Sequence, residues 1–172
     1  MKASVYIADA NILIDLLDLQ LGELWTSHFK CFTSVEVFNE LVLEGSPDDH
    51  AWLFDPDSVE VRSLDEDKLS QAASIREAHP ALSFPDCTVV VLARSESLIV
   101  LSGDGPMRKK AATLSIEVHG LLYVLDQLVQ IGALPGKEAV QLCRRWQMIN
   151  PRTPQKLCDK YCADWEARRS ND

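Results

Sequence analysis

Residues 98–106 read Leu-Ile-Val-Leu-Ser-Gly-Asp-Gly-Pro, which is an apolar run followed by a turn. A short, unbroken apolar run indicates a strand that is buried on both faces, as in the middle of a parallel sheet. The glycines and the proline that follow are typical of the turn that ends such a strand. The stretch therefore predicts a central parallel strand with Asp104 just beyond its carboxyl end.

Strand-like and helical patterns alternate on both sides of this run. Further strands are predicted at residues 4–8, 29–33, 59–62 and 116–118. Helical patterns cover residues 10–21, 35–42, 68–79, 83–93, 107–114, 121–131, 137–148 and 154–169. This alternation predicts an α/β fold, a three-layer α/β/α sandwich with a central parallel sheet, followed by C-terminal helices.

The domain organisation follows from length and composition. A chain of 172 residues fits one domain. We expect the main domain to span residues 1–125, with a helical C-terminal extension over residues 126–172 packed on it. No segment approaches the roughly 20 apolar residues of a membrane helix. The N-terminus lacks a signal-peptide pattern, so we expect a cytoplasmic protein.

The cysteines and the net charge narrow the classes of function. Five scattered cysteines without a signal peptide indicate reduced thiols used in packing, with a structural zinc site as the less favoured alternative. The 17 basic and 26 acidic residues give a net charge of −9. This charge argues against a protein that coats nucleic acid through a broad basic surface. It still permits a small site where carboxylates hold cations that act on nucleic acid.

Four acidic residues occupy positions that suggest such a site. Asp9 ends the first predicted strand and Asp104 follows the central one, and ligands bind at the carboxyl ends of parallel strands. Glu40 lies among apolar residues of a predicted helix, and Asp86 lies in the first turn of another. If all four converge, protons or cations must compensate their charge. Oxygen ligands of this kind select Mg²⁺ or Mn²⁺, which suits phosphodiester cleavage.

Each acid also has an ordinary structural interpretation. Asp9 and Asp86 are well placed to cap helices, because Asp is a preferred residue at helix N-termini. Asp104 between two glycines is a common turn residue. Glu40 fits a partly exposed helix position. The residues taken singly leave both interpretations open.

Taken together, the motifs resemble those of the PIN-domain nucleases. The matching stretches occur in the family's order and at its spacing, although each alone is a weak signature. They are Ile7-Ala8-Asp9-Ala10-Asn11, residues 34–41 ending in Glu40-Leu41, Leu82-Ser83-Phe84-Pro85-Asp86, Leu101-Ser102-Gly103-Asp104 and Met107-Arg108-Lys109-Lys110-Ala111.

The resemblance implies a divalent-metal-dependent endoribonuclease that hydrolyses RNA phosphodiester bonds, with Mg²⁺ or Mn²⁺ as cofactor. It assigns Asn11 to ordering the site and Ser102 to hydrogen bonding beside the metal ligands. The residues implied as catalytic and as metal ligands are Asp9, Glu40, Asp86 and Asp104.

The resemblance also implies partners. Many members of the family are toxins of toxin–antitoxin pairs, which form homodimers and are held inactive by a small antitoxin protein. That role stays open here, because the C-terminal extension weakens the assignment. A non-catalytic PIN-like module that binds protein or nucleic acid is the main alternative. A carboxylate-rich phosphatase or a flap-type DNA nuclease is a third interpretation.

The densest basic cluster of the chain follows Asp104 closely. Arg108, one helical turn beyond Asp104, has two interpretations, a contact for a substrate phosphate and a charge on a solvated helix face. Lys109 and Lys110 are interpreted as a solvated helix face.

Overall fold

The computed structural model describes residues 4–44, 52, 55 and 57–168. The chain divides into two compact units, Met1–His119 and Gly120–Asp172. The boundary lies six residues before the one expected from the sequence. No helix in the described ranges is both long and apolar enough to cross a membrane.

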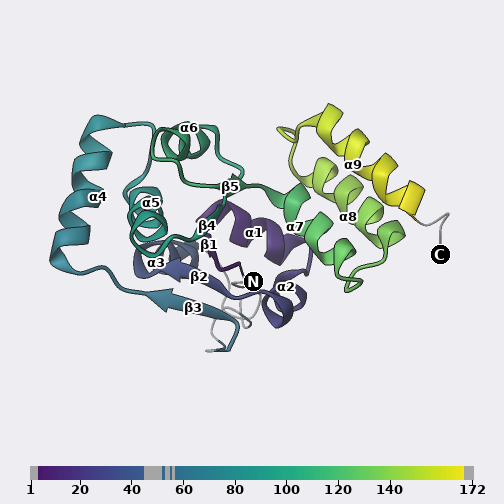
Figure 1. Ribbon diagram of the computed structural model, residues 1–172, viewed down its shortest axis with the longest axis horizontal. Helices are drawn as coiled ribbons and strands as arrows, with labels where there is room; N and C mark the ends of the chain where they lie inside the picture. The colour runs from purple at the N-terminus through teal and green to yellow at the C-terminus, as the bar shows by residue number, and fades with distance from the viewer. Residues whose placement is uncertain (1–3, 45–51, 53–54, 56, 169–172) are drawn as a thin grey trace. The chain divides into compact units, whose positions relative to one another are not determined.

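A five-stranded parallel sheet forms the centre of the first unit (Figure 1). Its strands are β1 (Tyr6–Ala8), β2 (Cys31–Ser34), β3 (Val59–Arg62), β4 (Ile99–Leu101) and β5 (Val118–His119). They lie side by side in the order β3-β2-β1-β4-β5. The apolar run at residues 98–101 contains β4, an interior strand between β1 and β5, while β1 occupies the middle position.

The register of the sheet places the ends of β1 and β4 side by side. Ala8 pairs with Leu101, and the backbone N–H of Asp9 donates to the carbonyl of Leu101 at 3.2 Å. The residues that follow the two strands, Asp9 and Ser102, therefore leave the sheet at the same level. This edge is where a ligand site is expected in a parallel sheet.

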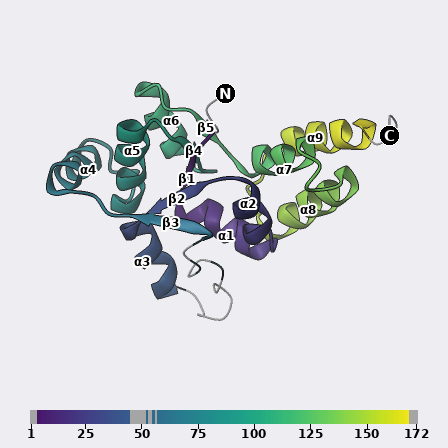
Figure 2. The ribbon, with the colours of Figure 1, turned by 60° about the horizontal axis from the view of Figure 1, so that its bottom comes forward.

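Helices flank this sheet, which confirms the predicted α/β/α fold (Figures 1 and 2). The helices of the first unit are α1 (Ala10–Asp18), α2 (Gly22–His28), α3 (Val35–Glu44), α4 (Glu66–Ala78), α5 (Phe84–Glu96) and α6 (Gly105–Thr113). The helix α5 packs against β1, β2 and β4. The helix α3 packs against α1 and α5. These contacts bring the N-terminal ends of several helices to the sheet.

The helix α2 is absent from the sequence prediction, which extended a single helix from residue 10 to residue 21. The structure ends α1 at Asp18, because Gln20 adopts a left-handed conformation with φ of 56°. The N–H groups of Gln20 and Leu21 then donate to the carbonyls of Leu17 and Leu16. These two bonds form a Schellman motif, which ends α1 and turns the chain into α2.

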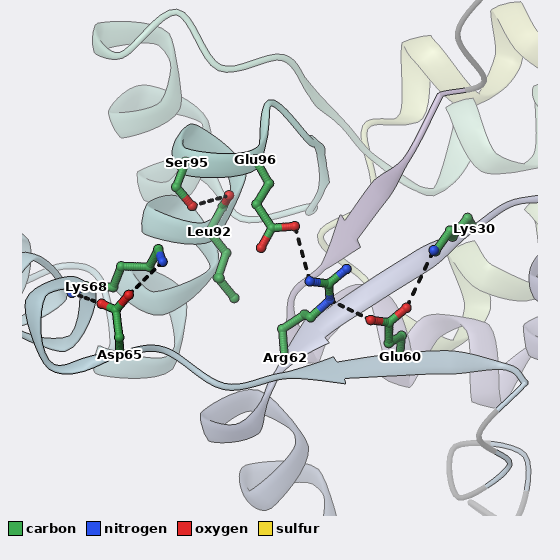
Figure 3. Close-up of polar contacts among 8 residues, drawn as sticks. All are labelled: Lys30, Glu60, Arg62, Asp65, Lys68, Leu92, Ser95 and Glu96. Atoms are coloured by element: carbon green, nitrogen blue, oxygen red, sulfur yellow. Dashed lines mark hydrogen bonds and ion pairs between the residues drawn. The ribbon is translucent and has the colours of Figure 1, made fainter.

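The edge strand β3 carries charged side chains that are linked across the sheet (Figure 3). Arg62 contacts Glu60 at 2.7 Å and Glu96 of α5 at 3.5 Å, and Lys30 approaches Glu60 at 3.6 Å. The guanidinium of Arg62 also lies 4.2 Å from the centre of the Phe32 ring. Charged residues on an edge strand hinder pairing with a strand of another chain.

The second unit consists of the helices α7 (Leu121–Gln130), α8 (Gly136–Ile149) and α9 (Gln155–Arg168). The helix α7 packs against α8 and α9, which explains why the unit begins at Gly120 and not at residue 126. Its core contains Trp165, whose indole N–H donates to Asp126 at 2.9 Å. Buried Cys143, Cys158 and Cys162 lie in the same unit, and all five cysteines of the chain are free.

Candidate functional site

The buried carboxylate of Asp9 begins the candidate site. Asp9 follows β1 and caps α1, and its Oδ1 accepts a hydrogen bond from the N–H of Ile12 at 2.9 Å. The residue has 0% of its surface exposed. Its second oxygen, Oδ2, accepts a hydrogen bond from the hydroxyl of Ser102. The carboxylate is therefore fixed by a helix on one side and by the neighbouring strand on the other.

Ser102 links Asp9 to Asp104. Its hydroxyl donates to Asp9 and accepts a hydrogen bond from the backbone N–H of Asp104 at 3.1 Å. Ser102 is itself fully buried directly beyond β4. A single hydroxyl thus holds the chain after β4 against the carboxylate that follows β1.

The carboxylates of Asp104 and Asp86 lie at two further helix N-termini. Asp104 caps α6, with its Oδ2 accepting from the N–H of Met107 at 2.9 Å. Asp86 forms a capping box with Ser83 at the start of α5, in which its Oδ2 accepts from the N–H of Ser83 at 3.0 Å. Both residues are half-buried. These bonds use one oxygen of each carboxylate.

The three carboxylates interact electrostatically. The pKa of Asp9 is raised to about 7, chiefly because burial disfavours its charged form. The hydrogen bonds from Ser102 and Ile12 act in the opposite direction, whereas the negative charges of Asp86 and Asp104 raise the pKa further. The arrangement thus gathers negative charge around a desolvated carboxylate.

Such a site fits a divalent cation in its donor chemistry. Carboxylate oxygens are the ligands that Mg²⁺ and Mn²⁺ prefer, and a cation would offset both the burial and the repulsion that raise the pKa of Asp9. In the part of the chain that the structure describes, no three His, Cys, Asp or Glu side chains are arranged closely enough to hold a metal ion. The donor set is therefore suitable, but the described side chains do not form a closed ligand shell.

The remaining predicted site residues have different surroundings. Glu40 is half-buried on α3, the helix that packs against α1 and α5. Asn11 is exposed in the first turn of α1. Arg108 is exposed on α6, and its Nη2 donates to the carbonyl of Ser102 at 3.2 Å. Hydrogen bonds join Asp9, Ser102 and Asp104, and the negative charge of Asp86 acts on Asp9.

A set of buried hydroxyls near these strand ends was not anticipated as part of the site. Thr88 of α5 donates to Ser34 at 2.8 Å and contacts the carbonyl of Pro85 at 2.6 Å. Ser34 in turn accepts from the N–H of Val37 at 3.2 Å, which caps α3. Thr33 donates to the carbonyl of Ala8 at 2.9 Å. Nothing in the sequence pattern distinguishes Thr88 from a packing residue.

A family comparison covers almost the whole chain. The family model DUF3368, described as a PIN domain, matches residues 5–166. No curated protein gave a match.

Solved structures give a second comparison. PAE2754 from Pyrobaculum aerophilum is 18% identical over 77% of this chain and 99% of its own, with a TM-score of 0.51. The PilT N-terminus domain protein SSO1118 from Sulfolobus solfataricus P2 is 11% identical over 72% of this chain and 92% of its own, with a TM-score of 0.50. VapBC2 from Rickettsia felis, solved with a DNA fragment from its promoter, is 12% identical over 67% of this chain and 98% of its own, with a TM-score of 0.49. At these identities, the first two likenesses show a shared fold.

Proposed function

Because the chain belongs to the PIN-domain family, we propose that it is a divalent-metal-dependent endoribonuclease that hydrolyses RNA phosphodiester bonds. The observation that carries the proposal is the complete burial of the Asp9 carboxylate, which Ser102 joins to Asp104; burial and the charges of Asp86 and Asp104 raise its pKa. A carboxylate is seldom buried without a compensating charge, and a cation is the compensation that this donor set suits.

We assign the cation to four carboxylates. Asp9 and Asp104 support the assignment by their place at the ends of adjacent strands, and Asp86 by its charge. Glu40 is included because its position in the sequence matches the family's motif. The proposed catalytic and metal-binding residues are Asp9, Glu40, Asp86 and Asp104.

The chain's own groups would orient this site. A bound Mg²⁺ or Mn²⁺ supplies positive charge to the substrate phosphate and lowers the pKa of water. Ser102 holds Oδ2 of Asp9 in place and fixes the backbone of Asp104. Asn11, in the same turn as the cap of α1, is proposed to order the site from its exposed side.

Arg108 is the proposed contact for a substrate phosphate at the site itself. Its guanidinium already reaches back along α6 to the carbonyl of Ser102. A planar guanidinium can donate to a phosphate while it keeps a bond of this kind, because it carries five N–H donors.

A non-catalytic PIN-like module that binds protein or nucleic acid is the second candidate. It is favoured by the finding that, within the described ranges, no three potential ligands are close enough for a metal ion. Such a module would retain the three acids as helix caps. It predicts a folded protein without metal-dependent cleavage.

The proposed partners, besides RNA, are a second copy of this chain and a small antitoxin protein. Two helices that pack together, α1 and α3, expose Ile14, Val42 and Leu43, and Leu43 has 86% of its surface accessible. Exposed apolar side chains such as Val42 and Leu43, which are adjacent on α3, are the kind that a protein partner covers. We also propose a cytoplasmic location, which suits five free cysteines.

The experiment that tests the proposal is cleavage of labelled single-stranded and hairpin RNAs in EDTA, Mg²⁺ and Mn²⁺. Wild-type protein should cut RNA only with a divalent ion, and Asp104→Asn should lose that activity. Asn is as good a helix cap as Asp, so the variant keeps the cap of α6 and removes its charge. Metal-independent cleavage, or equal turnover by the variant, would overturn the assigned site.

A further inference from the structure

Three basic side chains from two separate helical segments meet beside the start of α5. The Nζ of Lys110 on α6 lies 3.0 Å from Nε2 of His79, the residue that ends α4. Arg76, in the last turn of α4, donates from its Nη1 to the carbonyl of Pro80 at 3.1 Å. Figure 1 shows the connection from α4 to α5 passing close to α6. Arg76 and Lys110, which are 34 positions apart in the sequence, thus contribute to one surface.

This basic surface adjoins the candidate site. The connection that begins at His79 ends at Ser83, which forms the capping box with Asp86. Lys110 lies six residues beyond Asp104 on α6, about 9 Å along the helix axis. Burial and the charge of Asp86 raise the pKa of Cys87, while the charges of Arg76 and Lys110 oppose the rise. Both cations therefore lie near the first turn of α5.

The cations of this surface are not neutralised by carboxylates. Among the described residues, neither Arg76 nor Lys110 forms an ion pair with an acidic side chain, whereas Lys30, Arg62 and Lys68 each do. Lys110 contacts the imidazole of His79 at this surface and not a carboxylate. In a chain with a net charge of −9, two unneutralised cations beside an acidic site are suited to an anionic ligand.

We infer that Arg76, His79 and Lys110 form a phosphate-binding strip that holds the backbone of single-stranded RNA beside the α5 side of the candidate site. The inference rests on the proposed function, and it deepens that proposal by naming residues that position the substrate. It also changes the interpretation of Lys110, which the sequence pattern assigned to a solvated helix face. The contact with His79 shows that Lys110 belongs to a surface built from two helices.

The strip has a specific effect on the salt dependence of RNA binding. A protein that neutralises phosphates of a single strand releases counterions, and each contact contributes about 0.7 to the slope of log affinity against log salt concentration. Lys110→Ala should therefore reduce the slope by about 0.7. Arg76→Ala combined with Lys110→Ala should reduce it by about 1.4. Lys110→Arg should keep the wild-type slope, because it retains the charge.

The measurement is fluorescence anisotropy of a labelled single-stranded RNA with the full chain, between 50 and 200 mM salt, in EDTA so that no strand is cut. Lys30→Ala is the matched control, since it removes one positive charge at the amino end of β2, away from the strand ends that carry the acids. Its slope should equal that of the wild type.

The outcomes separate this inference from the proposed function. Wild-type slopes in Lys110→Ala and in the double variant, or no RNA binding by the wild type, would overturn the strip. An equal loss of slope in Lys30→Ala would also overturn it, because the effect would then be one of net charge. If the slopes fall as expected but Mn²⁺ produces no cleavage, the strip stands and the nuclease proposal fails.

Discussion

Three acids at the candidate site each cap or begin a helix and also add negative charge to the site. Asp9, Asp86 and Asp104 all accept backbone N–H groups at helix N-termini. The structure therefore supports the capping interpretation of Asp9 and Asp86, and it shows that Asp104, interpreted from the sequence as a turn residue, also caps a helix. The charges of Asp86 and Asp104 raise the pKa of Asp9, so these residues also concentrate negative charge at the site. Residue type could not separate the two interpretations, because aspartate serves both.

Replacing Asp9 should change how stability depends on pH. The pKa of Asp9 is about 7 in the folded protein and about 3.8 when unperturbed, so between these values the folded state keeps a proton that the unfolded state has released. Stability therefore falls as the pH rises through this range. Between pH 5 and pH 8, the free energy of unfolding of the wild type should fall by about 3 kcal/mol more than that of Asp9→Asn. Urea unfolding in EDTA measures both free energies.

Asp65→Asn provides the control for this prediction. Asp65 caps α4 through the N–H of Lys68, and its pKa is lowered by hydrogen bonds to Lys68. It stays ionised from pH 5 to 8, so its variant should follow the wild-type profile. Parallel profiles for the wild type and Asp9→Asn would show that Asp9 does not titrate in this range.

At the scale of elements, the sequence locates each of the five strands to within a few residues, and β1 and β4 are short apolar runs. It could not predict the strand order, since β1 pairs with β4 across more than 90 residues of chain. It also extended α1 to residue 21, because Leu21 continues the apolar pattern of the helix, and it missed α2. The left-handed turn at Gln20 has no sequence signal, because glycine is the usual residue there.

The helix starts allow a matched test of packing. A Cβ at Gly136, the first residue of α8, would lie 2.7 Å from the backbone oxygen of Trp165. Gly136→Ala should therefore destabilise the protein by about 1–3 kcal/mol, because the backbone of α9 at buried Trp165 must shift. A Cβ at Gly105, the first residue of α6, meets nothing within 4 Å. Gly105→Ala should be neutral or slightly stabilising.

Chemical unfolding of the two glycine variants measures this difference. The prediction fails if both substitutions have the same effect on the free energy of unfolding. Such a result would mean that α8 and α9 do not approach each other closely at Gly136.

At the scale of the whole molecule, the sequence predicted a main domain and a helical extension, and the chain forms two compact units. The family match spans parts of both, from residue 5 to residue 166. The net charge excluded a broad basic surface but could not locate a local one. Arg76 and Lys110 are far apart in sequence, and only the packing of α4, α5 and α6 brings them together.

The proposed cation site combines the carboxylates of Asp9, Asp86 and Asp104 at three helix N-termini with that of Glu40, and Mn²⁺ binding measured by isothermal titration calorimetry tests it most directly. Wild-type protein and Asp65→Asn should bind Mn²⁺ alike, because Asp65 caps α4 outside the candidate site. Asp9→Asn and Asp104→Asn should each lose binding while remaining folded, because Asn retains the cap and removes the charge. Equal Mn²⁺ affinity in the wild type and both site variants would contradict the account.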